Sequence, residues 1–310
     1  MIWRAACHAL CATMLAAQSP ARVEPSRADR AIAHGQLDDA EALLFEASRV
    51  SPRDPAPRRA LGNFLAARGR LKVGVVLLEE AKQFGADARG VDEQLAHIHG
   101  WIGSWTNGGM TAAGRAHGGP LGARAAYLAR HPSSLTGPDS TVVRLEPNEL
   151  RGLGRIAVEV GTVKIQADID AGLEGLLLPD TPELVNAVES FDGENGAQLS
   201  VAHSLTIGAF VIRNVPARLE RGASARVGLD VVGRLMPTFD PAAGTLTLHS
   251  GTFTRARGDD LPILLTFPGV RIVTRRDEAP VPLESAAGRS ALRRKRWTLD
   301  LREGVISLAR

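Results

Sequence analysis

The stretch 158–178 limits the fold of this 310-residue chain more than any other part of it. Two short apolar strands are separated by Gly161, and the second ends in Asp170-Ala171-Gly172 before a run of leucines. A carboxylate at the end of an apolar strand lies at the edge of a core. A charge there is costly unless it is hydrogen-bonded or shares a proton with a second carboxylate. We therefore expect Asp170 to be the centre of the protein's chemistry.

The segments around and after this motif resemble the retropepsin-like aspartic peptidases, over residues 150–250. In that family an active-site strand ends in Asp-Thr-Gly or Asp-Ser-Gly, which places the catalytic carboxylate on Asp170 and the loop glycine on Gly172. Ser204–Asn214 resembles the second hairpin of the family, and Arg226–Leu248 its closing section. The resemblance implies that Val227-Gly228 crosses behind the catalytic loop and supports it.

Two departures from the family pattern bear on activity. Ala171 stands where the family has Thr or Ser, so the hydroxyl that ties two active-site loops together is missing. Leu173-Glu174 follows the glycine, which puts a second acidic side chain near the site. Arg226 also replaces the first apolar residue of the segment behind the loop.

The resemblance implies hydrolysis of peptide bonds by a water molecule that two carboxylates activate while they share one proton. The C-terminal half of the chain has no second Asp-x-Gly motif, so a family-like pair requires a homodimer that joins Asp170 to its symmetry mate. The alternative is an inactive pepsin-like module that only binds proteins or peptides. Whether the protein is an enzyme stays open at this point.

The first 21 residues resemble a signal peptide. Arg4 is followed by the apolar segment Ala5–Ala17, and small residues come next. This predicts an exported protein, periplasmic or secreted. Cys7 and Cys11 are the only cysteines and lie in this segment, so the mature chain would have no thiol chemistry.

Residues 22–100 are predicted to form tetratricopeptide-like helical hairpins. The sequence between 27 and 88 repeats at an offset of 34 residues, which aligns Leu43-Leu44 with Leu77-Leu78. Small residues in this register would let paired helices approach closely. A generic pair of helical hairpins is the alternative, and either arrangement would bind or position a partner.

A glycine-rich linker with one short helix is expected over 101–140, before the peptidase-like lobe at 141–250. A weak repeat at an offset of 60 residues aligns Thr238-x-Asp240 with Thr298-x-Asp300. Residues 251–310 are therefore predicted to be part of a second β lobe. The predicted fold class is α+β and multidomain, with helical repeats followed by a mostly antiparallel pepsin-like lobe.

The remaining signals are negative. The eight histidines lack the spacing of metal ligands, and the chain has no dinucleotide-binding or phosphate-binding glycine motif, so we expect no metal and no cofactor. A net charge of +3 gives no support for a nucleic-acid partner. No apolar run reaches the length that crosses a bilayer. The expected partners are a protein or peptide substrate and a second copy of the chain.

Overall fold

The computed structural model describes residues 26–105, 120–148, 153–191, 197–251, 258–266, 269–275, 277–293 and 295–309. Its helices are α1 (Arg27–Ala33), α2 (Leu37–Val50), α3 (Pro55–Ala67), α4 (Leu71–Gln83), α5 (Ala88–Ile102), α7 (Pro120–Arg130), α8 (Pro182–Val185), α9 (Leu229–Val232), the 3₁₀ turn η1 (Gly233–Leu235) and α10 (Ala286–Leu292). The predicted signal peptide lies outside the described residues, as do residues 106–119 of the predicted linker.

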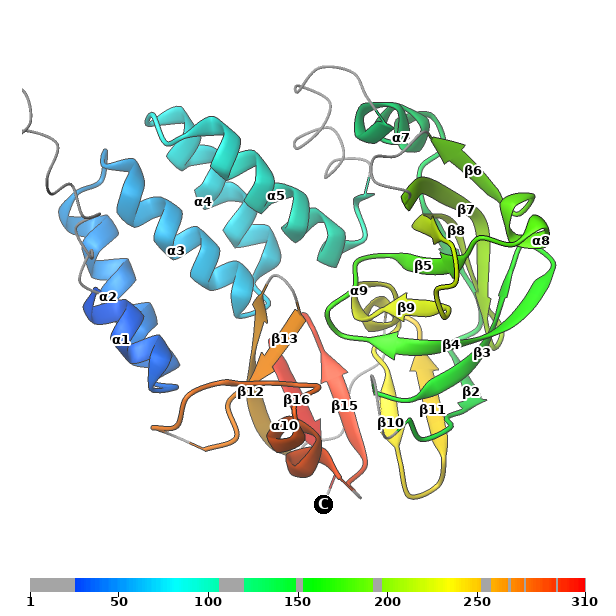
Figure 1. The fold of residues 1–310 in the computed structure, drawn as a ribbon. Helices are drawn as coiled ribbons and strands as arrows, with labels where there is room; N and C mark the ends of the chain where they lie inside the picture. Colours follow the sequence, from blue (N-terminus) through cyan, green and yellow to red (C-terminus); the bar gives the residue numbers. More distant parts are fainter. Residues whose placement is uncertain are drawn as a thin grey trace, which may run out of the picture.

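The strands begin after α7. They are β1 (Ser134–Thr136), β2 (Ser140–Arg144), β3 (Arg155–Val160), β4 (Val163–Asp170), β5 (Leu176–Pro179), β6 (Val188–Phe191), β7 (Ala197–Ile207), β8 (Phe210–Glu220), β9 (Arg226–Gly228), β10 (Thr238–Asp240), β11 (Thr245–His249), β12 (Asp259–Thr266), β13 (Gly269–Ile272), β14 (Val281–Pro282), β15 (Trp297–Asp300) and β16 (Val305–Leu308). Figure 1 shows the helices α1 to α5 on one side and the strands on the other and beneath them.

Six of these strands close into a barrel. The order β8-β5-β9-β4-β3-β7 returns to β8, because β7 and β8 also pair with each other along most of their length. Apolar residues alternate inward along β3 and β8, as expected for strands with one buried face. The predicted closed lobe is confirmed for this part of the chain, and β9 lies between β4 and β5 as its central support.

The first and last strands of the predicted lobe do not belong to the barrel. β2, β10 and β11 leave the barrel and join β12 to β16 in a second sheet, whose order is β14-β13-β12-β16-β15-β10-β11-β2. The predicted boundary at residue 250 therefore cuts through one sheet. The end of the predicted linker, residues 133–140, contains the strand β1, which pairs with β8. Barrel and second sheet share one apolar core, since residues of both lie in a single buried cluster.

The repeat at an offset of 60 residues appears as a local two-fold relation within this second sheet. β10 and β15 pair antiparallel, and Thr238 lies opposite Thr298, the residue with which it aligns in sequence. Their hydroxyl oxygens are 2.8 Å apart, and the rings of Phe239 and Trp297 stack with centroids 4.0 Å apart. The second copy of the hairpin thus pairs with the first inside one chain.

The helices α1 to α4 form the two predicted antiparallel hairpins, and α5 adds a fifth helix. Leu44 and Leu78 are buried as expected, whereas Leu43 and Leu77 are partly buried. α3 and α4 pack closely at two glycines, because a Cβ on Gly62 would lie 3.1 Å from that of Leu77 and one on Gly74 would lie 2.7 Å from that of Ala66. Membership of these hairpins in the tetratricopeptide family stays a prediction.

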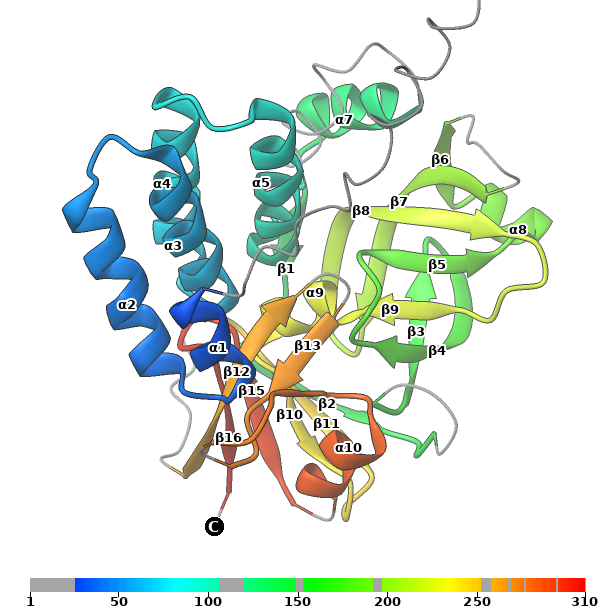
Figure 2. The same cartoon turned by 60° about the vertical axis from the view of Figure 1, so that its left-hand side comes forward.

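The helical array sits on the C-terminal β segment. Gly35 and Gly69 occupy equivalent turns of the two hairpins and have φ of +69° and +82°, a conformation that favours glycine. A Cβ on Gly35 would overlap the carbonyl oxygen of Glu278, and one on Gly69 would overlap that of Leu301. Apolar residues of α1 to α3 also share a core with Leu264 and Val273. Figure 2 shows this contact from a second direction, with α1 beside β12.

Candidate functional site

The end of β4 and the segment behind it place Asp170. β4 and β9 run parallel with Asp170 opposite Gly228, and the Gly228 N–H donates to the Gly175 carbonyl at 2.7 Å. A Cβ on Gly228 would overlap the Leu173 carbonyl oxygen, so only glycine fits there. Val227 is buried in the core. Val227 and Gly228 therefore pack behind the Asp170 loop, and their role in supporting a catalytic site stays a prediction.

The Asp170 carboxylate is held from two sides. Its Oδ1 accepts the Gly172 N–H at 2.8 Å, and its Oδ2 accepts from Nη1 of Arg226 at 2.9 Å. The Asp170 side chain is 17% exposed, so this ion pair is largely shielded from water. Nε of Arg226 is buried without a hydrogen-bond partner in the described structure. The replacement of an apolar residue by Arg226 thus leads to a direct contact with the candidate catalytic group.

A second carboxylate reaches this loop from the C-terminal segment. Oε1 of Glu284, in the turn between β14 and α10, accepts the Ala171 N–H at 2.5 Å. Burial raises the pKa of Glu284, and the nearby negative charge of Asp170 raises it further, against the Ala171 hydrogen bond and the cations Arg289 and Arg226. A carboxyl group in this setting keeps its proton to higher pH than an exposed one.

Glu284 was missed by the sequence analysis, which looked for a second Asp-x-Gly motif. The 60-residue repeat gives no signal for an acid at this position, because the residue that aligns with Glu284 is Ser224. The C-terminal segment also covers the loop elsewhere, since a Cβ on Gly269 would lie 3.2 Å from the Ala171 carbonyl oxygen. Ala171 itself is buried, so its side chain lies in the core.

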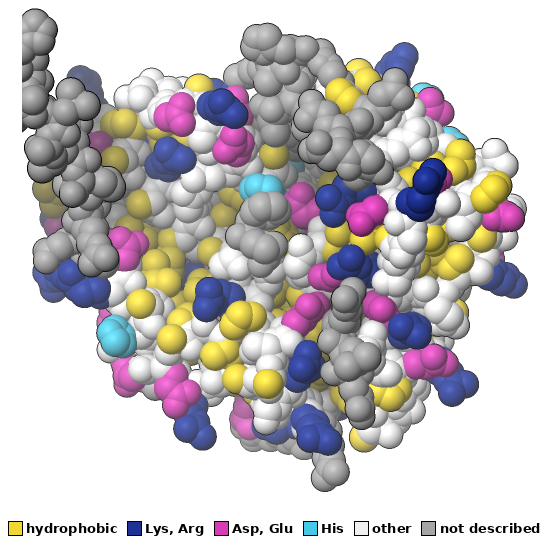
Figure 3. Space-filling model, viewed as in Figure 1, with side chains coloured by type: hydrophobic (Ala, Val, Ile, Leu, Met, Phe, Trp, Pro, Cys, Tyr) yellow, Lys and Arg dark blue, Asp and Glu magenta, His cyan; other side chains and the backbone are white. Residues whose placement is uncertain are grey.

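Glu174, the second acidic residue predicted near the site, turns toward the helices. Its Oε1 lies 2.6 Å from Nδ1 of His97 on α5. It is therefore a link between barrel and helical array. Figure 3 shows acidic and basic side chains together across the middle of this face, between the helices and the barrel.

A further buried acid bonds to the backbone of the loop that follows Asp170. Asp230, on α9, accepts the Gly175 N–H at 3.0 Å and a hydrogen bond from Trp105. Burial, more than the charge of Glu174, raises the pKa of Asp230 to about 7. The guanidinium of Arg234 stacks on the Trp105 ring at 4.8 Å, so this cluster joins the end of α5 to the segment behind Asp170.

Three other aspartates have structural surroundings. Asp168 is buried, and its carboxylate accepts from Nε of Arg155 at 2.8 Å, because Arg155 lies directly opposite it on β3. Asp240 and Asp300 accept backbone N–H groups in their own turns.

Among the described residues, no group of three His, Cys, Asp or Glu side chains is arranged to hold a metal ion. None of the described helices is long and apolar enough to cross a membrane.

No family model and no curated protein matches the chain. Among solved structures, it is similar to a retropepsin-like aspartic protease from Rickettsia conorii, with 17% sequence identity and a TM-score of 0.29. The match covers 38% of this chain and 92% of the Rickettsia chain. A likeness at this score leaves the family of the chain open.

Proposed function

We propose that the protein is an exported peptide hydrolase of the aspartic type, in which one chain supplies both carboxylates, Asp170 and Glu284. The observation that carries the proposal is the position of Glu284. A carboxyl group with a raised pKa bonds to the backbone of the residue that follows Asp170, and the charge of Asp170 contributes to that shift. Pairs of acids whose surroundings favour different protonation states are typical of acid–base catalysis.

The two carboxyl groups would take complementary parts. Asp170, in contact with Arg226 and the Gly172 N–H, is the ionised base that accepts a proton from water as its oxygen attacks the peptide carbonyl. Glu284 is the protonated acid that donates a hydrogen bond to the carbonyl oxygen. The C–N bond then breaks as Asp170 passes the proton that it took from water to the leaving amine. The helical array would bind or position the polypeptide.

A single-chain pair makes the predicted homodimer unnecessary for catalysis. Within this one chain, β10 already has β11 on one side and β15 on the other. The role that the family resemblance gave to a symmetry mate is thus proposed for the C-terminal segment of the same molecule.

The test compares Asp170→Asn and Glu284→Gln with wild type on an unstructured protein substrate from acidic to neutral pH. Each amide keeps the shape of the side chain but cannot exchange a proton, so we expect a loss of about a hundredfold or more in kcat/KM for both. Glu278→Gln is the matched control, because Glu278 is in the same segment and, among the described residues, its carboxylate pairs only with the exposed Arg275. Its activity should equal that of wild type.

The pH dependence adds an independent check. Because Glu284 must hold a proton, activity should fall as the pH rises through its raised pKa. Activity retained by Glu284→Gln but lost in Asp170→Asn would reject the single-chain pair and favour the dimer.

An inactive binding module is the second candidate function. Arg226 favours it, because the guanidinium lies on the oxygen of Asp170 that a catalytic water would use. The absence of a hydroxyl at Ala171 points the same way. Equal background cleavage by wild type, Asp170→Asn and Glu284→Gln would leave this function in place.

A further inference from the structure

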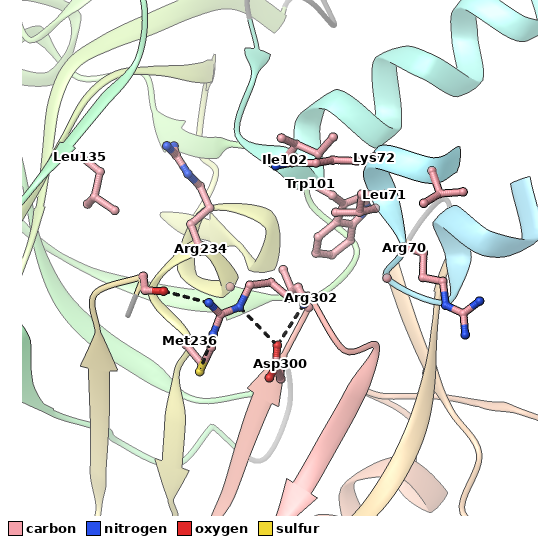
Figure 4. Close-up of a pocket in the computed structure, with 15 residues that line it drawn as sticks. Arg70, Leu71, Lys72, Trp101, Ile102, Leu135, Arg234, Met236, Asp300 and Arg302 are labelled. Carbon is pink, nitrogen blue, oxygen red and sulfur yellow. Dashed lines mark hydrogen bonds and ion pairs between the residues drawn. The ribbon is translucent and has the colours of Figure 1, made fainter. Parts of the chain in front are cut away.

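A cavity of about 560 Å³ lies where the helical array meets the β segments, apart from the residues around Asp170. Its walls are the start of α4 (69–73), the end of α5 at Trp101 and Ile102, the turn after α9 (233–236), and the β15–β16 hairpin at 300–302. Figure 4 shows these elements converging from the helical and the β side of the molecule. The cavity is therefore created by the seating of the array on the C-terminal segment.

Much of the lining is apolar. Leu71, Trp101 and Ile102 form the helical wall, and Leu135 lies on the β side. Leu301 also lines the cavity. The volume is within the range of about 300–1,000 Å³ that is typical of sites for small molecules. Water in such a space makes few hydrogen bonds with the wall, so an apolar group of matching shape would gain contacts there.

The charged lining is mainly positive. The basic lining residues Lys72, Arg234 and Arg302 outnumber Asp300, the one acid among the lining residues. Arg302 is oriented by its neighbours: Nη1 donates to the Gly251 carbonyl at 2.8 Å, Nη2 to Sδ of Met236 at 3.5 Å, and Nε lies 3.7 Å from Oδ1 of Asp300. Arg70, the remaining basic residue, pairs with Glu41 and points away from the other labelled side chains.

Lys72 contributes a cation that no acid of the described residues neutralises. Its side chain is exposed, and it makes no ion pair with any residue that the structure describes. It also lies in the first turn of α4, which has no side-chain cap. The backbone N–H groups of a first helical turn lack partners within the helix and add positive potential on the same side of the cavity.

We propose that this cavity binds a small carboxylate with an apolar body, such as an acyl chain of medium length. The apolar part lies between Trp101 and Leu301, and the carboxylate lies on the side of Lys72 and Arg302. A neutral ligand would leave the positive side unmatched, and a cationic one would be repelled by it. This site is independent of the proposed hydrolase activity.

The test is calorimetric titration of the full-length protein with decanoate, below its micelle concentration, and with decanol as the uncharged analogue. Lys72→Glu is the decisive variant. An acid in the first turn of a helix is favourable to the helix, so the fold should be kept. We expect decanoate to bind wild type and to bind Lys72→Glu about tenfold or more weakly, while decanol affinity stays the same in both. Lys164→Glu on β4, also exposed, is the matched control and should bind decanoate as wild type does.

Tryptophan fluorescence locates the ligand. Decanoate should change the emission of wild type, and Trp101→Phe should remove most of this change while the heat of binding remains. The proposal is overturned if no saturable heat appears with decanoate, if decanol binds as tightly as decanoate, or if Lys72→Glu and Lys164→Glu behave alike.

Discussion

At the scale of single residues, Asp230 shows how burial sets the pH response of the fold. Its carboxyl group is fully buried, and burial raises its pKa from 3.8 to about 7. In the unfolded chain the group ionises near its ordinary value, so between about pH 4 and pH 7 the folded protein holds a proton that the unfolded chain has lost. The contribution of the protonated Asp230 to the stability of the fold is therefore complete at low pH and is lost as the pH rises through this window.

We predict that the free energy of unfolding falls between pH 4 and pH 7 by up to about 4 kcal/mol through Asp230 alone, since one pKa unit corresponds to about 1.4 kcal/mol. Asp230→Asn, which cannot titrate, should flatten this part of the curve. Urea unfolding followed by circular dichroism at several pH values measures it. The exposed Asp180→Asn serves as control and should keep the wild-type slope. Equal slopes for wild type and Asp230→Asn would contradict the prediction.

At the scale of elements, the turn between α3 and α4 couples the helical array to the β15–β16 hairpin. Gly69 needs both its positive φ and the absence of a side chain, because a Cβ would overlap the Leu301 carbonyl oxygen. Gly85, after α4, also has a positive φ of +98°, but a Cβ there would meet no atom within 4 Å. Alanine variants of these two glycines therefore distinguish the cost of backbone strain, present in both, from the cost of a packing clash, present only at Gly69.

We predict that Gly85→Ala lowers the free energy of unfolding by about 1 kcal/mol, the strain of a left-handed conformation. Gly69→Ala should lower it by about 1–3 kcal/mol more, because the helical array must also shift away from the hairpin. Thermal and urea unfolding measure both. Equal losses for the two variants would show that the turn does not bear on the contact between the array and the hairpin.

At the scale of the whole molecule, the C-terminal segment completes the second sheet by pairing β15 with β10 inside one chain. β10 is paired on both sides within the chain, and Phe239 stacks on Trp297 inside the shared core. We predict that the purified protein has the mass of one chain by light scattering, at concentrations where it cleaves substrate. Glu284→Gln should have the same mass. A dimer whose dissociation abolishes activity would contradict the prediction.

The sequence alone determined the local structure well. Alternating apolar residues and turn glycines predicted the hairpin that ends at Asp170, and the 34-residue register predicted the two helical hairpins with Leu44 and Leu78 inside. These features depend on neighbours within a few positions, and the period of the apolar residues reports which face of an element is buried.

Only the tertiary structure decided which buried faces meet. Glu284 is far from Asp170 in sequence, and its raised pKa comes from burial and from the charge of Asp170, neither of which a local pattern records. The ion pair of the buried Asp168 depends on tertiary structure too, since its partner Arg155 is set by the register of β3 against β4. The seating of Gly35 and Gly69 on the C-terminal segment likewise depends on packing between distant parts of the chain. Periodicity identifies a buried side chain, but its partner is determined by how the elements pack in three dimensions.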